Sequence, residues 1–194
     1  MAWLIAGLGN PGDEYARTRH NAGRLVVDEL AARLGGVRLR KTRFLAAEAA
    51  EGTIGDQVVW LVTSTRFMNE SGPSYASFAH KHDINPGHAV AVHDEIEIPP
   101  EELMVKFGGG SAGHNGIRSL AQALGTQDFY RVRMGVGRPP GRQDPADFVL
   151  QRVSAGAWDG FAVDITRAAD AVECLVTEGL EPAQQRFNRR AGRA

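Results

Sequence analysis

Short apolar runs of strand length alternate in this chain with stretches whose apolar residues have helical spacing. Residues 2–7 form one such run, and the apolar positions of residues 21–34 then recur at intervals of three and four, as one face of a helix requires. Further strand-like runs occupy residues 89–93, 103–107 and 131–137. Because helices that alternate with strands pack over the faces of a sheet, the pattern predicts an α/β fold.

One pair of apolar runs is too close in sequence to be joined by a crossover helix. Residues 44–50 and 57–63 flank a short segment with two glycines, which predicts an antiparallel hairpin. A sheet that contains both a hairpin and helix-connected strands is mixed. We therefore expect one domain over residues 1–194, built on a mixed, twisted β-sheet flanked by helices, with mostly helical structure after residue 137.

A chain of 194 residues with 43% hydrophobic residues can form such a core without cross-links. Its only cysteine, Cys174, has no partner for an internal disulfide, which favours a reducing cytosol. The first residues lack a basic leader and a long apolar run, so we expect neither a secretory signal nor a membrane span. These features predict a soluble, cytoplasmic protein.

The formal net charge of -1 argues against a protein that coats nucleic acid indiscriminately. Basic residues nevertheless gather locally, at residues 38–43, 131–142 and 186–193. The last group we interpret as solvated surface and tail. Local basic patches on a nearly neutral protein suit a few contacts with one end of an RNA.

Three glycines, Gly7, Gly9 and Gly12, match the dinucleotide-binding fingerprint after a strand. That fingerprint also needs an acidic residue at the end of a second strand, and the carboxylates at the right spacing lie inside the predicted helix. Pro11 removes a backbone N–H from the loop that would hold the pyrophosphate. We therefore interpret this segment as a tight turn that presents Asn10.

The sequence GGSAG at residues 109–113 matches the nucleophile elbow of α/β-hydrolases. In those enzymes the acid and then the histidine follow the serine, whereas His114 is the only histidine after Ser111 and is too close to it. The serine mechanism therefore fails on chain order, and Ser111 is expected to be a loop residue.

Acidic residues and a histidine also cluster at His93, Asp94, Glu95 and Glu97. Neighbouring residues of a strand face opposite sides, so His93 and Asp94 cannot both point into one metal site without a bend. The chain has no HExxH or CxxC pair. We expect no metal and no cofactor.

Polar side chains follow several of the predicted strands. Ligands in open α/β sheets bind outside the carboxyl ends of the strands, so the polar loops are expected on one rim. These loops are residues 7–12, residues 64–72, the segment at Asp94 and the glycine-rich residues 108–116. Their amides and phenol suit a neutral, hydrogen-bonding substrate such as an ester or amide.

His20 has the intrinsic pKa range of a general base near neutral pH. A carboxylate on its far ring nitrogen would fix the tautomer and stabilise the imidazolium, and Asp94, at a strand tip, suits that task. Since no serine or cysteine nucleophile is credible, the base would act on water.

Four separated segments resemble the signature segments of bacterial peptidyl-tRNA hydrolases, in the same order and at similar separations. They are GLGNPGDEYARTRHNAG at residues 7–23, FMNESG at 67–72, HDE at 93–95 and GGGSAGHNG at 108–116, with further similarity in RVRMGVGRP and FVL. The resemblance covers nearly the whole chain. It implies the peptidyl-tRNA hydrolase-like (phosphorylase/hydrolase-like) fold, a monomer, and hydrolysis of the ester between peptide and tRNA, which recycles tRNA.

The resemblance also implies residue roles. His20 would accept the proton of water, Asp94 would hold it in its basic form, and Asn10 would help to distinguish peptidyl from free aminoacyl substrates. Residues near the ester or lining the same cleft would be Tyr15, Phe67, Met68, Asn69, His114 and Asn115. Lys106 and Arg133 would bind the terminal 5′ phosphate of the tRNA through charge-assisted hydrogen bonds.

Each assignment has a purely structural alternative. Asn10 can simply shape a turn, Phe67 and Met68 can be core side chains, Tyr15 can pack with only its hydroxyl exposed, and His114 can cap the next helix.

Two positions depart from the family pattern. Met104 stands where many relatives carry a second basic residue, and Ser64 replaces a common proline. A noncatalytic RNA-binding relative and an unrelated small-ester or peptide hydrolase remain the alternative functions.

Overall fold

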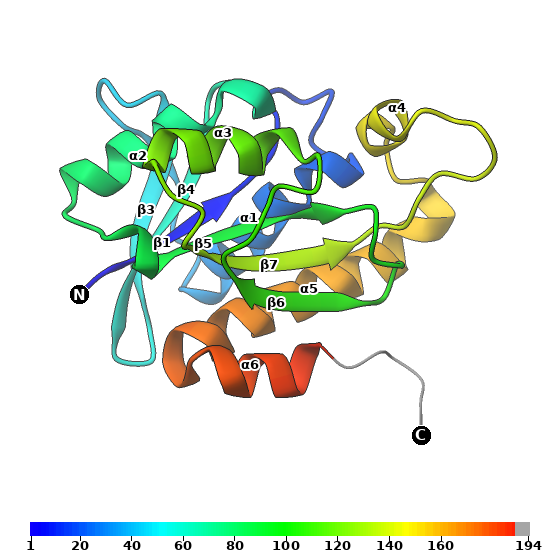
Figure 1. The fold of residues 1–194 in the computed structure, drawn as a ribbon. Helices are drawn as coiled ribbons and strands as arrows, with labels where there is room; N and C mark the ends of the chain where they lie inside the picture. The colour runs from blue at the N-terminus through cyan, green and yellow to red at the C-terminus, as the bar shows by residue number, and fades with distance from the viewer. Residues whose placement is uncertain (189–194) are drawn as a thin grey trace.

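The computed structural model describes residues 1–188, and within that range the strands form one seven-stranded sheet with the order β2-β3-β4-β1-β5-β7-β6 (Figure 1). The strands are β1 (Trp3–Gly7), β2 (Arg40–Lys41), β3 (Ala47–Ile54), β4 (Gln57–Ser64), β5 (Ala89–Glu95), β6 (Leu103–Phe107) and β7 (Tyr130–Gly135). β1 is parallel to β4 and β5, and β5 is parallel to β7. β2, β3 and β6 pair antiparallel with their neighbours, which confirms the predicted mixed sheet.

The predicted hairpin is confirmed, although its turn is shorter than the sequence suggested. β3 continues to Ile54, so only Gly55 and Asp56 separate it from β4. Gly55 has a φ of 57°, a conformation that glycine adopts without steric cost. The two-residue strand β2, which falls within the basic segment at residues 38–43, was not predicted.

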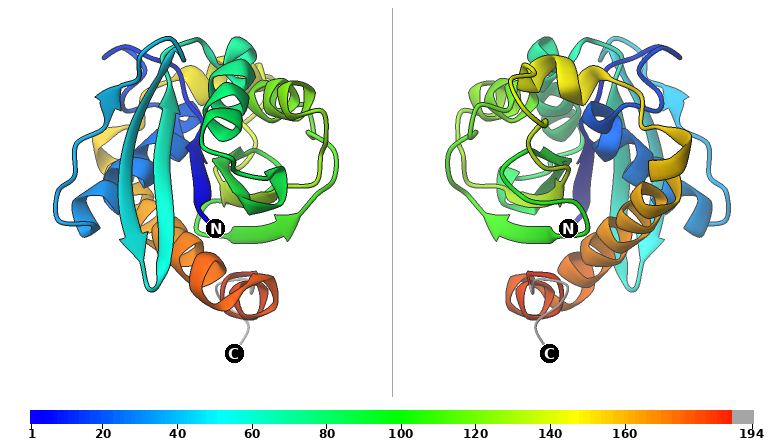
Figure 2. Two further views of the ribbon diagram at one scale, coloured as in Figure 1. Left: turned by 90° about the vertical axis from the view of Figure 1, so that its left-hand side faces the viewer. Right: turned by 90° about the vertical axis from the view of Figure 1, so that its right-hand side faces the viewer.

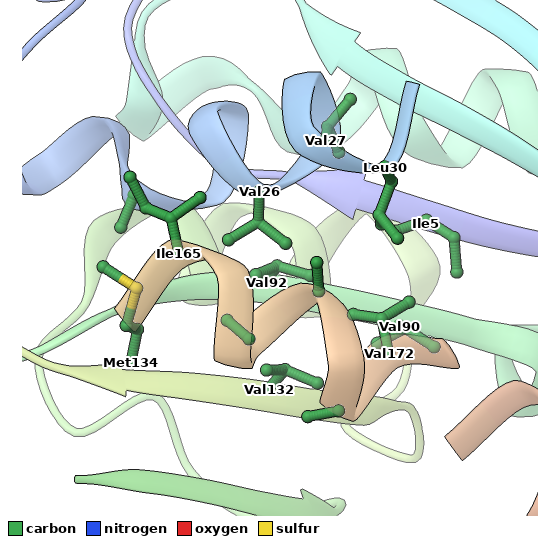
Figure 3. Packing of buried hydrophobic residues seen from close by; sticks show 14 of the residues in the cluster. Ile5, Val26, Val27, Leu30, Val90, Val92, Val132, Met134, Ile165 and Val172 are labelled. Carbon is green, nitrogen blue, oxygen red and sulfur yellow. The ribbon is translucent and has the colours of Figure 1, made fainter. Parts of the chain in front are cut away.

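Helices cover both faces of the sheet (Figure 2). They are α1 (Ala22–Arg33), α2 (Gly72–Lys81), α3 (Asn115–Leu124), α4 (Pro145–Leu150), α5 (Ala155–Glu178) and α6 (Leu180–Phe187). α1, α5 and α6 pack on one face, whereas α2 and α3 pack on the other. Along β5, Val90 and Val92 face α1 and α5, as Figure 3 shows, while Ala89 and Ala91 face α2 and α3. This alternation splits the core into two layers.

α1 lies unusually close to the central strands because a glycine stands at the point of contact. A Cβ on Gly23 would lie 2.0 Å from the Val92 carbonyl oxygen and 2.4 Å from the Leu8 nitrogen. Only glycine permits this approach. The start of α1, and with it the short 3-10 helix Arg19–Asn21 before it, is therefore placed directly against the carboxyl ends of β1 and β5.

The end of β4 is fixed by a buried tyrosine. The Tyr75 hydroxyl of α2 donates to the Gly7 carbonyl oxygen at 2.8 Å and accepts from the Ser64 N–H at 3.2 Å. The Ser64 Oγ also lies 3.0 Å from both the Ser74 Oγ and the Arg66 nitrogen. Ser64 therefore anchors the loop that follows β4, and its N–H makes a bond that a proline at this position lacks.

Of the C-terminal basic group, Arg186 lies in α6 and forms an ion pair with Glu178. Arg189, Arg190 and Arg193 lie outside the described residues. No helix of residues 1–188 is long and apolar enough to cross a bilayer.

Candidate active site

The carboxyl end of β5 carries a buried carboxylate. Asp94 is 2% exposed and receives two imidazole rings, His20 from the 3-10 helix before α1 and His114 from the start of α3. Burial disfavours the charged carboxylate, but the two rings outweigh burial and hold the pKa of Asp94 well below its ordinary range. Asp94 is thus an anion at neutral pH.

His20 donates to Asp94 through one ring nitrogen and keeps the other available. Its Nδ1 lies 3.0 Å from Oδ1 and 3.1 Å from Oδ2 of Asp94. An ionised carboxylate only accepts, so Nδ1 carries the proton and Nε2 of the neutral ring holds a basic lone pair. Burial of the ring lowers the pKa of His20, but the charge and hydrogen bond of Asp94 outweigh burial and raise it above 6.5.

His114 contacts the same carboxylate and also caps a helix. Its Nε2 lies 2.9 Å from Asp94 Oδ1, while its Nδ1 accepts from the backbone N–H groups of Gly116 at 3.1 Å and Ile117 at 3.3 Å. Because Nδ1 accepts, the proton of the neutral ring is on Nε2 and is donated to Asp94. The cap and the position beside the cleft, which the sequence left as alternatives, occur together.

The two functions of His114 can be separated by substitution. His114→Asn keeps a side-chain acceptor for the first turn of α3 but is too short to reach Asp94, whereas His114→Ala loses both contacts. We expect kcat to fall by roughly tenfold or more in both variants, since a hydrogen bond to a charged group is worth about 1.5–3 kcal/mol.

The free energy of unfolding, measured by urea denaturation, should fall by about 1 kcal/mol more in His114→Ala than in His114→Asn, because only alanine lacks the cap. Full activity of His114→Asn would show that the donation to Asp94 is dispensable.

Asn10 is held so that its amide nitrogen is left for the cleft. Its Oδ1 accepts from the Met68 N–H at 2.7 Å, which fixes the orientation of the amide. Its backbone N–H and carbonyl both pair with the side chain of Asn21, at 2.8 and 2.9 Å. Asn10 therefore shapes the turn and also lines the cleft. Asn21 was not singled out from the sequence, because nothing local marks a contact made eleven residues away.

A cleft of about 590 Å³ opens beside these groups. Eight of the predicted site residues line it: Asn10, His20, Phe67, Met68, Asn69, Asp94, His114 and Asn115. Tyr15 lies just outside, with its ring edge to face against Phe67 and a centroid separation of 6.2 Å. The four polar loops therefore meet on one rim.

One wall of the cleft was missed. It comes from α4 and its N-cap and includes Asp144, Pro145, Ala146, Val149 and Leu150. The sequence carried a signal for this helix, because Asp144 precedes Pro145 and its carboxylate accepts from the Ala146 N–H at 2.7 Å as an N-cap. The sequence pattern alone predicts only a mostly helical region here, without a separate α4.

Lys106 and Arg133 lie next to the cleft, on β6 and β7, rather than within it. The Arg133 Nη2 lies 3.0 Å from the Oε2 of Glu95, a buried residue that lines the cleft and was not predicted to matter beyond a possible metal site. Burial and then the charges of Arg133 and Arg131 lower the pKa of Lys106. Met104 pairs with Arg133 across the strands, and its sulfur lies 3.9 Å from Arg133 Nη1.

Arg131 was grouped with the local basic surface, and that assignment is wrong. It is 2% exposed, and its guanidinium donates to the carbonyl oxygens of Gly109 and Gly110. These bonds tie the glycine-rich loop to β7. Sequence alone does not distinguish a buried arginine that binds carbonyls from one in solvent.

The alternative sites weighed from the sequence do not form in the described residues. Ser111 lines a separate hollow beside α3 rather than the cleft. The His93 Nδ1 lies 2.7 Å from the Asp94 carbonyl oxygen, while Glu95 pairs with Arg133 and Glu97 with Arg138. The side chains of the acidic segment therefore point to different partners and do not converge on an ion.

A different trio has the proximity of metal ligands. One ligand atom each from His20, Asp94 and His114 lie within 4.8 Å of one another. The ring nitrogens that face Asp94 are donors in the hydrogen-bonding pattern described above, whereas a metal ligand needs an unprotonated nitrogen. The donor set thus fits a carboxylate held by two N–H groups better than a cation site.

A basic imidazole oriented by a buried carboxylate beside an open cleft, on a mixed α/β sheet, is the arrangement of an enzyme that uses histidine as a base. The comparisons with known proteins give the particular family. A family model described as peptidyl-tRNA hydrolase matches residues 4–194, and the chain belongs to this family.

Individual relatives agree over nearly full length. A peptidyl-tRNA hydrolase from Kineococcus radiotolerans is 49% identical, with 96% of this chain and 97% of that protein covered. One from Mycobacterium marinum is 48% identical, with coverages of 95% and 96%. The crystal structure of peptidyl-tRNA hydrolase from Acinetobacter baumannii superposes with a TM-score of 0.89 at 33% identity, covering 96% of this chain and 94% of that one. The predicted family and fold are confirmed.

Proposed function

We propose that this protein hydrolyses the ester between the peptide and the tRNA of peptidyl-tRNA, with His20 as the general base. The observation that carries the proposal is the His20 Nδ1 contact with Asp94, which leaves Nε2 basic in a ring that lines the cleft. Nε2 takes a proton from water as the water oxygen attacks the ester carbonyl carbon. Collapse of the tetrahedral intermediate breaks the bond to the ribose oxygen, which receives the proton back from His20.

Asp94 acts through His20. It orients the ring and stabilises the imidazolium that exists between the two proton transfers. His114 donates to the same oxygen of Asp94 and so helps to keep the carboxylate in place. The chemistry needs no cofactor and no metal in this proposal, because the base and its counter-charge are both supplied by side chains.

Neutral groups around the cleft would bind the substrate near the ester. The free amide hydrogens of Asn10, with Asn69 and Asn115, can donate to ester and peptide carbonyls. Tyr15, Phe67 and Met68 provide apolar surface along the same rim. In this assignment Asn10 favours a peptidyl substrate over a free aminoacyl group.

Lys106 and Arg133 would hold the 5′ phosphate of the tRNA acceptor end. They lie on neighbouring strands beside the cleft, and Glu95 fixes one nitrogen of Arg133 while its other N–H groups remain to bind phosphate. We further propose that residues 1–194 work as one domain, as a monomer in the cytoplasm.

The direct test is release of tRNA from N-acetylated aminoacyl-tRNA by the purified protein, with a chelator present. We expect multiple turnovers that added divalent metal does not increase, because the base and its counter-charge belong to the protein. Tight binding of tRNA without turnover would instead identify a noncatalytic RNA-binding relative.

A second arm of the same assay tests the phosphate contact. Arg133→Ala should raise KM and weaken its dependence on salt, since one fewer phosphate contact releases fewer counterions. Lys81→Ala, which removes an exposed cation at the end of α2 outside the basic groups named above, is the control. Turnover that is insensitive to Arg133→Ala, to salt and to tRNA truncation would favour a hydrolase of small esters.

A further inference from the structure

The loop between β2 and β3 holds an aromatic side chain in an unfavourable position. Phe44 is 90% exposed and has a φ of 69°, and Ala46 two residues later has a φ of 49°. Left-handed backbone is disfavoured for residues with a Cβ, and a bulky residue there is a marked outlier. Both the strain and the exposure of a phenyl ring destabilise the folded chain. Such costs persist where surrounding contacts impose them, and they accumulate at functional sites.

Hydrogen bonds fix this loop against the segment that leads into the cleft. The Thr42 N–H and hydroxyl both donate to the Ala47 carbonyl oxygen, at 2.8 and 2.9 Å, which closes the loop on itself. The Thr65 N–H donates to the Ala46 carbonyl oxygen at 2.9 Å. Two residues beyond Thr65 the chain reaches Phe67, which is 52% exposed, lines the cleft and contacts Tyr15. The loop that carries Phe44 is therefore hydrogen-bonded to the segment that leads to Phe67, and residues 40–46 and 65–67 together form a rim beside the cleft.

This rim is also basic. Arg40, Lys41, Arg43 and Arg66 are all exposed, and within residues 1–188 none of them belongs to an ion pair. The Arg43 guanidinium carbon lies 5.2 Å from the centroid of the Phe44 ring. Glu48, the nearby carboxylate on β3, is paired with Arg24. The rim thus combines exposed aromatic rings with basic side chains that form no ion pair within residues 1–188.

The order of strands decides which part of a substrate would reach this rim. β5 with Asp94 and β1 with the Asn10 loop lie in the middle of the sheet, β7 and β6 lie on one side, and β4, β3 and β2 lie on the other. In the proposed function the tRNA phosphate is held over β7 and β6 by Arg133 and Lys106. With the ester at His20, the acyl group then leaves on the opposite side, across β1 and β4.

We infer that Phe44, with Arg43 and Arg66, forms a docking surface for the peptide part of the substrate, several residues from the ester and beyond the cleft residue Phe67. The inference rests on the proposed function. Aromatic faces contact peptide side chains of many kinds, and the arginines favour carboxylates, so peptides with acidic residues should bind best. An N-acetylated amino acid is too short to reach Phe44 and serves as the internal reference.

The test compares three substrates on one tRNA: an N-acetylaminoacyl group, a neutral octapeptide and an octapeptide with several aspartates. For the unaltered protein, KM should be lowest for the acidic octapeptide. Phe44→Asn should raise KM for the acidic octapeptide by roughly two- to tenfold, the range for one aromatic contact. It should leave kcat and KM on the short substrate unchanged. Phe44→Tyr, which keeps the ring, should retain the advantage.

Two further measurements separate binding from structure. Asparagine tolerates left-handed backbone, so Phe44→Asn should have an unchanged or higher Tm. Arg43→Gln and Arg66→Gln should reduce the preference for the acidic over the neutral octapeptide. Val163→Asn, at a 58% exposed position on α5, is the matched control and should change nothing.

Three results would overturn the inference while leaving the proposed function intact. They are an equal KM for short and long substrates in the unaltered protein, an equal loss on both in Phe44→Asn, and weaker binding of deacylated tRNA by Phe44→Asn, which would make this an RNA-binding surface. Failure to hydrolyse the short substrate at all would contradict the proposed function instead.

Discussion

Replacing His20 by alanine is expected to lower kcat for N-acetylaminoacyl-tRNA by roughly 10²- to 10⁴-fold, the usual contribution of a general base. The base is lost, but the basic residues beside the cleft remain. The dissociation constant for deacylated tRNA should therefore stay within about threefold of the unaltered value, because these groups and not His20 hold the RNA in this mechanism. Rapid-quench kinetics and filter binding measure the two quantities separately.

Alanine also removes one of the two donors to a buried carboxylate, so a second variant guards against misfolding. His20→Asn retains an amide donor for Asp94 but has no basic lone pair. It should fold normally and be as inactive as His20→Ala. His80→Ala, which removes an exposed histidine at the end of α2, is the control and should have full activity. Near-normal turnover by folded His20→Asn would rule out His20 as the base.

Asp94→Asn is expected to change both the rate and its dependence on pH. An amide offers one oxygen and one NH₂ group where the carboxylate accepts from His20 Nδ1 at both of its oxygens and from His114 Nε2. The NH₂ group would then face a ring N–H, and relief of that clash moves the proton of His20 onto Nε2, where the base is needed. We expect kcat at its pH plateau to fall on the order of 10³- to 10⁴-fold.

The direction of the pH shift follows from the charge that is removed. Asp94 raises the pKa of His20, and only the neutral ring is a base, so activity of the unaltered protein should fall as pH drops through a value above 6.5. Without the carboxylate, burial alone acts on the ring and lowers this pKa. The acidic limb of the kcat/KM profile of Asp94→Asn should therefore move to lower pH. The pairing of His20 with Asp94 would be contradicted if the acidic limb of Asp94→Asn moved to higher pH, or if its kcat at the plateau equalled that of the unaltered protein.

The sequence predicted the architecture well because the signals for it are local. Short apolar runs predicted the central strands, and the close spacing of two such runs identified the β3-β4 hairpin. Short or irregular elements were not predicted. β2 has only two residues, and α4 is separated from α5 by four residues that interrupt a long helical pattern. Neither leaves a periodicity long enough to read.

The reaction centre was predictable only in part. His20, Asp94 and Asn10 stand in recognisable segments, and strand-end position suggested that they meet. The partners that hold them were not found, because Asn21, Glu95 and the second role of His114 depend on contacts across the fold. The prediction that Arg131 lies on the surface was wrong for another reason. Its guanidinium donates to carbonyl groups of the glycine-rich loop, and no local sequence pattern specifies the conformation of that loop.

The shared carboxylate has a consequence for how the chain becomes active as it is made. His20 precedes Asp94 by 74 positions, and His114 follows it by 20. A ribosome therefore adds His20 to the chain long before Asp94, its counter-ion. Asp94 is in turn added before His114, which helps to hold the carboxylate in place. Contacts of such sequence separation form late, after the loops between them have closed. Recovered activity after dilution from denaturant is thus a stricter sign of complete folding than any signal from the hairpin alone.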